Sequence, residues 1–284
     1  MGKQPAYKHR KEKMPELALS QLEKLYALFS SKGWPIDESL EVSEFERYCA
    51  MLSNMDNSHQ DFMIGLSQNF EHITVKDYLH NLLKPLRKLR EDAGKDNLVF
   101  VTCTPKKDVG CVKSSAAVLY QIKGTTIRQY INLHPYYVAD NIKTAFSDNM
   151  QNCRVVLVDD FVGTGETAMG AVDFVHELCP GLTDNSKIVV LCIIAMKDGV
   201  ELLKSKGIST YCHHIRQKGI SEELGEQERI AALKNMTEIE ANLKRLKGDC
   251  RFGYKKSEAL ICMERCPNNT FPIYWLGNRA PYER

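Results

Sequence analysis

The chain has 284 residues, of which 43% are hydrophobic and 26% are charged, a composition typical of globular proteins and not of disordered ones. Lys and Arg number 38 against 36 Asp and Glu, so the formal net charge of +2 gives the whole molecule no strong attraction to nucleic acid. No run of about 18 apolar residues exists, and the first residues lack the apolar stretch of a signal peptide. We therefore expect a cytoplasmic protein without membrane attachment.

The ten cysteines predict buried thiols and no zinc site. A reduced thiol in an apolar run behaves as a small hydrophobic side chain. Cys262 and Cys266 are four residues apart, but no second pair has zinc-finger spacing, so we expect no zinc site. Most of the cysteines lie in apolar runs, among them Cys103, Cys153, Cys192, Cys212 and Cys262.

Residues 1–95 are expected to form an all-helical N-terminal region that begins with a basic, solvated tail at residues 1–13. Apolar residues from Leu17 to Phe29 recur near a period of 3.6, as on one face of a helix. Short helices around tight turns are compatible with a winged-helix-like module, and equally with a helical bundle.

Local signals predict where two later helices begin and end. Ser43 followed by Glu46 has the pattern of a capping box. Thr74 is a candidate N-cap, and Gly94 a candidate stop, for the last helix of this region.

Residues 96–284 are expected to form an α/β domain with a C-terminal helical and aromatic-rich extension. Short apolar runs that alternate with helical segments indicate a parallel sheet with crossovers. The expected strands are 98–103, 126–133, 155–158, 188–195 and 208–213, and the expected helices are 114–121, 167–178 and 200–206, with a charged helical segment at 221–247. In the extension, Tyr274 and Trp275 are expected to anchor the chain on the core.

The segment Val155–Ala168 carries the strongest chemical signal. A wholly apolar strand is followed by Asp159 and Asp160, then by a Gly- and Thr-rich loop and a helix. In open α/β sheets ligands bind beyond the carboxyl ends of the strands. Glycines there allow backbone amides to approach a phosphate, and the helix N-terminus adds its dipole. The two carboxylates can accept hydrogen bonds from ribose hydroxyls and can hold Mg²⁺ directly or through water.

On these residues, Val155–Thr167 resembles the thirteen-residue signature of type I phosphoribosyltransferases, which bind phosphoribosyl pyrophosphate (PRPP). The resemblance implies that Asp159 and Asp160 are catalytic and face the ribose 2- and 3-hydroxyls, with Mg²⁺ as cofactor. It also implies an α/β fold of that family and a homodimer. The loop that would grip the 5-phosphate consists of Phe161, Val162, Gly163, Thr164, Gly165, Glu166 and Thr167.

A second resemblance concerns the C-terminal part. Arg251–Trp275 resembles phosphoribosyltransferase-like effectors of bacterial conflict systems, some of which accompany retrons. It implies a role in anti-phage defence or toxicity and, for a retron-associated member, a reverse transcriptase and its DNA–RNA product as partners.

The sequence departs from the family pattern at two places. Gly163 stands where purine-salvage members often carry an acid, which puts a purine acceptor in doubt. Thr104–Gly110 replaces the usual Arg-Gly-Gly-like pyrophosphate loop, and its Lys106 and Lys107 are candidate pyrophosphate ligands.

Three further functions stay open. The fold could serve as a non-catalytic sensor of PRPP or a nucleotide that acts through the N-terminal helices. Asp160–Gly165 has glycines like those of an amino-methyltransferase, although only His134–Tyr137 stands for its catalytic segment. A P-loop NTPase is disfavoured because no Lys follows the glycines. His213 and His214 close an expected strand, where packing is the more common role.

Overall fold

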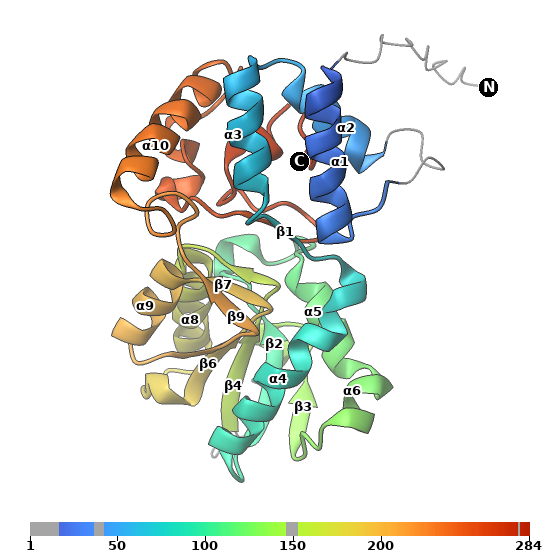
Figure 1. The fold of residues 1–284 in the computed structure, drawn as a ribbon. Helices are drawn as coiled ribbons and strands as arrows, with labels where there is room; N and C mark the ends of the chain where they lie inside the picture. Colours follow the sequence, from blue (N-terminus) through green and yellow to red (C-terminus); the bar gives the residue numbers. More distant parts are fainter. Residues whose placement is uncertain (1–16, 37–42, 146–152, 278) are drawn as a thin grey trace, which may run out of the picture.

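The structure is a computed structural model that describes residues 17–36, 43–145, 153–277 and 279–284 (Figure 1). The basic tail expected at residues 1–13 lies outside these ranges. Five parallel strands form the main sheet in the order β3-β2-β4-β6-β8. Their bounds are β2 Asn97–Thr102, β3 Tyr136–Val138, β4 Cys153–Val158, β6 Ile188–Leu191 and β8 Ser209–Tyr211. The α/β class and the parallel sheet are thereby confirmed.

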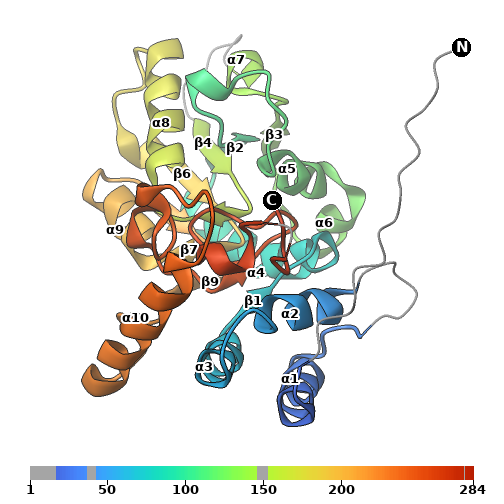
Figure 2. The ribbon, with the colours of Figure 1, turned by 90° about the horizontal axis from the view of Figure 1, so that it is seen from above.

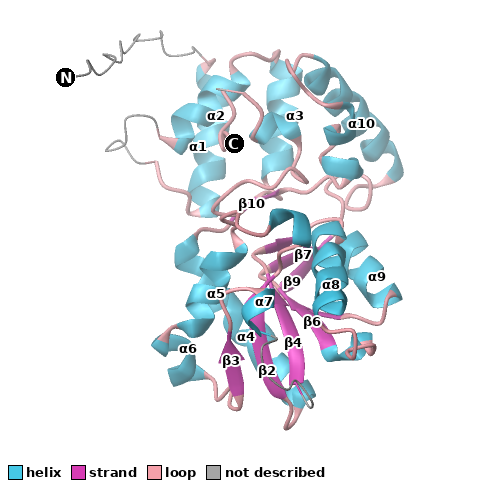
Figure 3. Cartoon of the chain, turned by 180° about the vertical axis from the view of Figure 1, so that it is seen from behind, coloured by secondary structure: helices cyan, strands magenta, loops and turns pink. Residues whose placement is uncertain are grey.

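Helices cover both faces of this sheet (Figure 3). Successive residues of a strand point to opposite faces, so Leu98 and Phe100 join one apolar cluster while Val99 and Val101 join the other. The first cluster packs against α4 Val75–Ala93, α5 Ser115–Lys123 and α6 Thr125–Tyr130. The second packs against α7 Ile142–Ala145, α8 Glu166–Leu178 and α9 Lys197–Ser205. Burial on both faces explains why the strands are continuous apolar runs.

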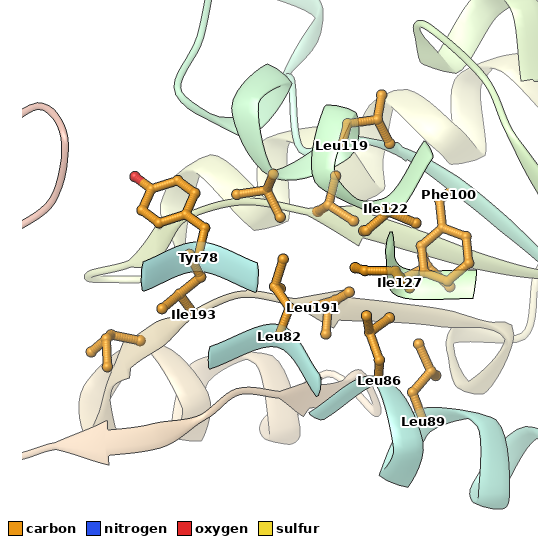
Figure 4. Packing of buried hydrophobic residues seen from close by; sticks show 14 of the residues in the cluster. Tyr78, Leu82, Leu86, Leu89, Phe100, Leu119, Ile122, Ile127, Leu191 and Ile193 are labelled. Carbon is orange, nitrogen blue, oxygen red and sulfur yellow. The ribbon is translucent and has the colours of Figure 1, made fainter. Parts of the chain in front are cut away.

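The first cluster is built along α4, whose apolar stripe lies over the sheet (Figure 4). Leu82, Leu86 and Leu89 of this helix are fully buried with Phe100 of β2. Tyr78 lies at the start of the stripe and turns its hydroxyl out of the apolar cluster (Figure 4). That hydroxyl is free to serve a polar partner at the strand ends.

Three strands break after their carboxyl ends and continue in a second parallel sheet. This sheet has the order β5-β7-β9, with bounds β5 Phe161–Val162, β7 Ile194–Met196 and β9 His214–Arg216. Two residues separate each strand of the main sheet from its continuation. Asp159 and Asp160 are the two residues of the break between β4 and β5. The acid pair therefore lies at the step between the two sheets.

Two expected strands differ from the structure because of this step. The expected strand 188–195 is split into β6 and β7, and the strand expected at 208–213 ends as β8 before β9 begins. No Gly or Pro marks either break, and at Cys192 and Ile193 the apolar run continues through it.

The strand expected at Thr126–Leu133 is wrong. Residues Thr125–Tyr130 form the helix α6, which follows Gly124 directly. The β-branched residues at its start suggested a strand. Ile127 and Ile131 instead pack one helical turn apart on the first apolar cluster, and the Ile131 N–H donates to the Ile127 carbonyl at 2.9 Å.

The N-terminal helices share a third apolar cluster with the C-terminal segment (Figure 2). They are α1 Leu19–Lys32, α2 Glu44–Leu52 and α3 Asn57–Ser67, and they pack with α10 Glu226–Ala241, with residues 252–275 and with Tyr282. β1 Glu71–His72 pairs in parallel with β10 Ile261–Cys262, and the described helices carry no hairpin of the winged-helix kind. Short 3₁₀ turns lie at Lys106–Asp108, Asn185–Lys187, Gly248–Cys250, Tyr254–Lys256 and Pro272–Tyr274. The boundary expected at residue 95 stays a prediction.

The capping box at Ser43 and Glu46 is confirmed. The Ser43 N–H donates to Glu46 Oε2 at 2.8 Å, and the Glu46 N–H donates to Ser43 Oγ at 3.2 Å. Thr74 caps α4, where its N–H donates to Asp77 Oδ2 at 2.9 Å, and α4 ends before Gly94. Within the described ranges, no helix is both long and apolar enough to cross a membrane.

Phe70→Ala tests whether the N-terminal helices and the C-terminal segment form one core. The Phe70 ring is fully buried, 4.4 Å from the ring centre of Tyr274 and 5.3 Å from that of Tyr282. We expect the variant to lose about 3–5 kcal/mol of unfolding free energy in urea denaturation, because it leaves a cavity. Tyr26→Ala on α1 is the matched control, since Tyr26 is 59% exposed, and should change the value by no more than about 0.5 kcal/mol. Similar small losses in both variants would contradict a shared core.

Candidate functional site

A pocket of about 750 Å³ opens at the step between the two sheets. This volume lies in the range of roughly 300–1,000 Å³ found for small-molecule sites. Its walls come from the acid pair and the loop after β4, from the segment after β2, and from the C-terminal segment. The residues of the three walls are 159–168 with Gly170, 103–115 in part, and Tyr254, Met263, Arg265–Asn269 and Arg284. The structure thus brings every expected site residue to one pocket.

The two carboxylates of the acid pair differ in their surroundings. Asp160 is only 4% exposed, and both of its oxygens are engaged. Ser114 Oγ donates to Oδ1 at 2.7 Å and Tyr78 Oη to Oδ2 at 3.2 Å. Asp159 is partly exposed to the pocket, and among the described residues its side chain accepts a hydrogen bond only from the Asp160 N–H, at 3.0 Å. Asp159 is therefore the acid with oxygens left for a ligand.

Burial raises the pKa of both carboxyls above the usual range of Asp. For Asp159, the negative charge of Asp160 adds to burial, while the charge of Lys113 acts in the opposite direction. For Asp160, the hydrogen bonds from Ser114 and Tyr78 stabilise the anion and limit the rise of its pKa. The pair therefore resists carrying two charges unless a cation or a ligand compensates them.

The loop after β5 presents unpaired backbone donors to the pocket. No acceptor in the described ranges takes a backbone N–H of Gly163–Thr167, and α8 begins at Glu166 after Gly165, which has φ 82°. Such an N-terminus attracts anions through its N–H groups and its dipole. Gly163 has a packing reason as well, because a Cβ there would lie 2.3 Å from the side chain of Asn269.

Two residues of the C-terminal segment bind the carboxylate of Glu166, which also lines the pocket. Its carboxylate forms an ion pair with Lys255, and Tyr254 Oη donates to it at 3.0 Å. The hydrogen bond from Lys255 lowers the pKa of Glu166, with further lowering from Tyr254 and from the charge of Lys107. The acidic residue at the start of α8 is thus neutralised by the chain itself.

The lysines after β2 have different partners. Lys106 forms an ion pair with Glu177 on α8, although it also lines the pocket. Lys107 lines the pocket without an ion pair among the described residues. Lys113 pairs with Asp108 at 2.9 Å and lies near enough to Asp159 to lower the pKa of that carboxyl. Pyrophosphate contact by Lys106 and Lys107 stays a prediction, and Lys113 joins them as a candidate.

Sequence reasoning missed Tyr78, Ser114 and the C-terminal wall of the pocket. Ser114 had one usable signal, since it directly precedes a helix that follows a strand. Tyr78 belongs to the apolar stripe of α4 and looks like any core residue. His213 and His214 do not line this pocket. His214 Nε2 lies 3.1 Å from Glu71 Oε1.

Trp275 and Tyr274 anchor the C-terminal segment, as expected. Trp275 Nε1 donates to the Thr270 carbonyl at 2.7 Å, and the buried Tyr274 hydroxyl lies 2.9 Å from Ser67 Oγ. The segment that forms the third wall of the pocket is therefore fixed on the N-terminal helices.

Asp159→Asn tests the electrostatic strain of the acid pair. An Asp in an unfolded chain titrates near pH 3.9. Because the folded pKa of Asp159 is higher, the folded state binds more protons, and its stability falls as the pH rises from that value through the folded pKa. The variant removes the charge and keeps Oδ1 for the Asp160 N–H. We expect its unfolding free energy to exceed that of the wild type by on the order of 1 kcal/mol at pH 7, and the difference to vanish near pH 4.

Asp173→Asn provides the control, because Asp173 is an exposed residue of α8 outside the pocket. Chemical denaturation at the two pH values measures both variants. A loss of stability in Asp159→Asn at pH 7, or an equal gain in Asp173→Asn, would contradict a strained pair.

The comparison with known proteins gives a family. The profile of the PRTase-CE family, a family of phosphoribosyltransferase-like proteins, matches residues 52–283. The chain matches no curated protein. Two solved structures are similar over part of the chain: orotate phosphoribosyltransferase from Aeropyrum pernix, with 15% identity over 49% of this chain and 70% of that chain and a TM-score of 0.30, and the AQ2163 protein from Aquifex aeolicus, with 13% identity over 63% of this chain and 96% of that chain and a TM-score of 0.33. Because the family profile matches more than half of this chain, the chain belongs to the PRTase-CE family.

Proposed function

We propose that the pocket binds PRPP with Mg²⁺ and that the chain transfers or cleaves the phosphoribosyl group at its anomeric carbon. One observation carries the proposal: a loop of unpaired backbone N–H groups and a partly exposed carboxylate meet in one pocket of suitable size. These two features complement the two chemically distinct parts of a sugar phosphate, the phosphate and the hydroxyls.

The 5-phosphate would lie on the loop Phe161–Thr167. The N–H groups of this loop and the dipole of α8 attract an anion, and Thr164 and Thr167 can add hydroxyl donors. The ion pair with Lys255 neutralises the carboxylate of Glu166, which would otherwise repel a phosphate bound to this loop.

The ribose hydroxyls would meet Asp159. Its carboxylate retains acceptor capacity, whereas Asp160 already accepts hydrogen bonds from Tyr78 and Ser114. We therefore assign direct contact to Asp159 and the orientation of the pair to Asp160. A charged Asp159 would also stabilise positive charge that develops on the ribose as the bond to pyrophosphate breaks.

The donor set fits Mg²⁺ that arrives with its substrate. Mg²⁺ is commonly held by one or two carboxylates, with phosphates and water completing the shell. Within the described ranges no cluster of three or more His, Cys, Asp or Glu could hold a metal alone, so Asp159 would share the ion with phosphate oxygens. When bound, Mg²⁺ would neutralise charge on the pyrophosphate.

The chain's own cations would assist the leaving group. Lys107 and Lys113 line the pocket on the wall that follows β2, where a pyrophosphate can lie across from the phosphate loop. In the reaction, the C–O bond to pyrophosphate breaks with its electron pair on pyrophosphate. A lone pair of the acceptor forms the new bond to the anomeric carbon, and the proton released by the acceptor passes to water or to pyrophosphate.

A second candidate function is a PRPP or nucleotide sensor without catalysis. The neutral side chain of Asn269 fills the space beside Gly163, so the loop places no acid or base of its own there. The anti-phage role, the reverse transcriptase with its DNA–RNA product, and the homodimer rest on resemblance alone and stay predictions.

Calorimetric titration of PRPP with Mg²⁺ tests the proposal on the folded protein. We expect saturable binding to the wild type and affinity at least about tenfold weaker in Asp159→Asn/Asp160→Asn, a loss of about 1.4 kcal/mol or more. The control Asp173→Asn keeps the wild-type affinity, because its side chain is exposed outside the pocket.

Three outcomes separate the alternatives. Binding together with release of pyrophosphate on adding acceptor candidates supports the transferase. Binding without any release favours the sensor. Unchanged affinity in the double variant, or no binding to the wild type, contradicts a PRPP site at the acid pair.

A further inference from the structure

The C-terminal segment supplies a wall of the pocket that the proposed PRPP contacts leave unused. We call it the tail wall, and it comprises Tyr254, Met263, Arg265, Cys266, Pro267, Asn268, Asn269 and Arg284. The phosphate loop and the lysines after β2 form the other sides of the same pocket. The tail wall therefore offers contacts that neither the 5-phosphate nor the pyrophosphate of PRPP uses in the proposed binding mode.

Close contacts fix the tail wall to the phosphate loop. The carboxamide of Asn269 rests directly on Gly163, where an added Cβ would lie 2.3 Å from its atoms. Asn269 Nδ2 donates to Ser257 Oγ at 3.2 Å, and Ser257 Oγ donates to the backbone carbonyl of Asn269 at 2.8 Å. Lys255 and Tyr254 bind Glu166 at the start of α8. The wall is thus part of a built site and not a loose chain end.

The two arginines of the tail wall have no carboxylate partner among the residues that the structure describes. Neither Arg265 nor Arg284 has an ion-pair partner in the described part of the chain. The Arg284 guanidinium lies 5.9 Å from the ring centre of Trp275. Both arginines line the same pocket, and burial, followed by the positive charge of Arg265, lowers the pKa of Arg284.

Three other cations of this region behave differently, whereas Lys107 also has no ion-pair partner among the described residues. Lys106, Lys113 and Lys255 each have a carboxylate partner. Two guanidinium groups that line one pocket without a carboxylate partner repel each other. A bound anion relieves that repulsion. Arg binds phosphate and carboxylate in a bidentate manner, so an oxyanion is the ligand that this wall fits.

We infer that the tail wall is the acceptor subsite and that the acceptor carries an oxyanion, a phosphate or a carboxylate, which Arg265 and Arg284 bind. The inference rests on the proposed transferase function. The acceptor must reach the anomeric carbon from the side away from the leaving pyrophosphate, and the tail wall lines the pocket with residues other than the lysines assigned to pyrophosphate. Asn269 Oδ1, which has no donor among the described residues, can accept an N–H of the attacking group.

The test compares matched probes on the full chain. Phenyl phosphate, benzoate and neutral benzamide are titrated in ligand-observed NMR, with ribose 5-phosphate, pyrophosphate and Mg²⁺ present to occupy the other subsites. The proteins are the wild type, Arg265→Gln/Arg284→Gln and the control Arg279→Gln. Arg279 is an exposed residue of the same segment outside the pocket, where it hydrogen-bonds Asn54.

We expect the wild type and Arg279→Gln to bind at least one anionic probe about tenfold more tightly than benzamide, and the double variant to lose this preference. The stronger of phenyl phosphate and benzoate identifies the oxyanion. Equal binding of charged and neutral probes, an unchanged preference in the double variant, or no binding of any probe overturns the inference.

PRPP titration of the same variants separates this inference from the proposed function. Arg265→Gln/Arg284→Gln should bind PRPP within about threefold of the wild type. A much larger loss would assign the arginines to PRPP itself and overturn the acceptor subsite. If the wild type binds no PRPP, the proposed function fails, while the anion preference is still measured by the probes alone.

Discussion

Two adjacent carboxylates, one buried and one partly exposed, lie at the step between the two parallel sheets. The surrounding residues compensate for the cost of placing two charges there. Burial and mutual repulsion raise the pKa of both groups. Tyr78 from α4 and Ser114 before α5 bind Asp160, and Lys113 acts on Asp159. The hydrogen bond from Tyr78 thereby holds helix α4 at the end of β4. Because Asp160 is occupied by these donors, Asp159 is the carboxylate available to a ligand.

The C-terminal segment connects this site to the N-terminal helices. Tyr274 packs against Phe70 and hydrogen-bonds Ser67, while Asn269 of the same segment rests on Gly163. The shape of the pocket therefore depends on helices that are distant from the acid pair in sequence.

The sequence predicts the parts of the site that are local. Asp159, Asp160 and the following loop were recognisable because a strand, two acids, glycines and a helix follow one another without interruption. The capping box at Ser43 was predictable for the same reason, since its partners are three residues apart.

The parts that depend on long-range packing were not predictable. The break between β6 and β7 falls at Cys192 and Ile193, which continue the apolar run and carry no turn signal. Arg265 and Asn269 reach the pocket only because their segment folds back over the loop after β5. Tyr78 was indistinguishable from a core residue until its hydroxyl was placed beside Asp160.

Hydrogen exchange with and without PRPP and Mg²⁺ tests most directly whether the acid pair, the phosphate loop and the tail wall form one binding site. The account predicts that the ligand slows exchange in residues 161–170 and, in the same experiment, in residues 252–270, because the two segments contact each other beside the ligand. Slower exchange elsewhere with both segments unchanged, or in the loop alone while the tail wall is unaffected, would contradict a single site built from the three walls.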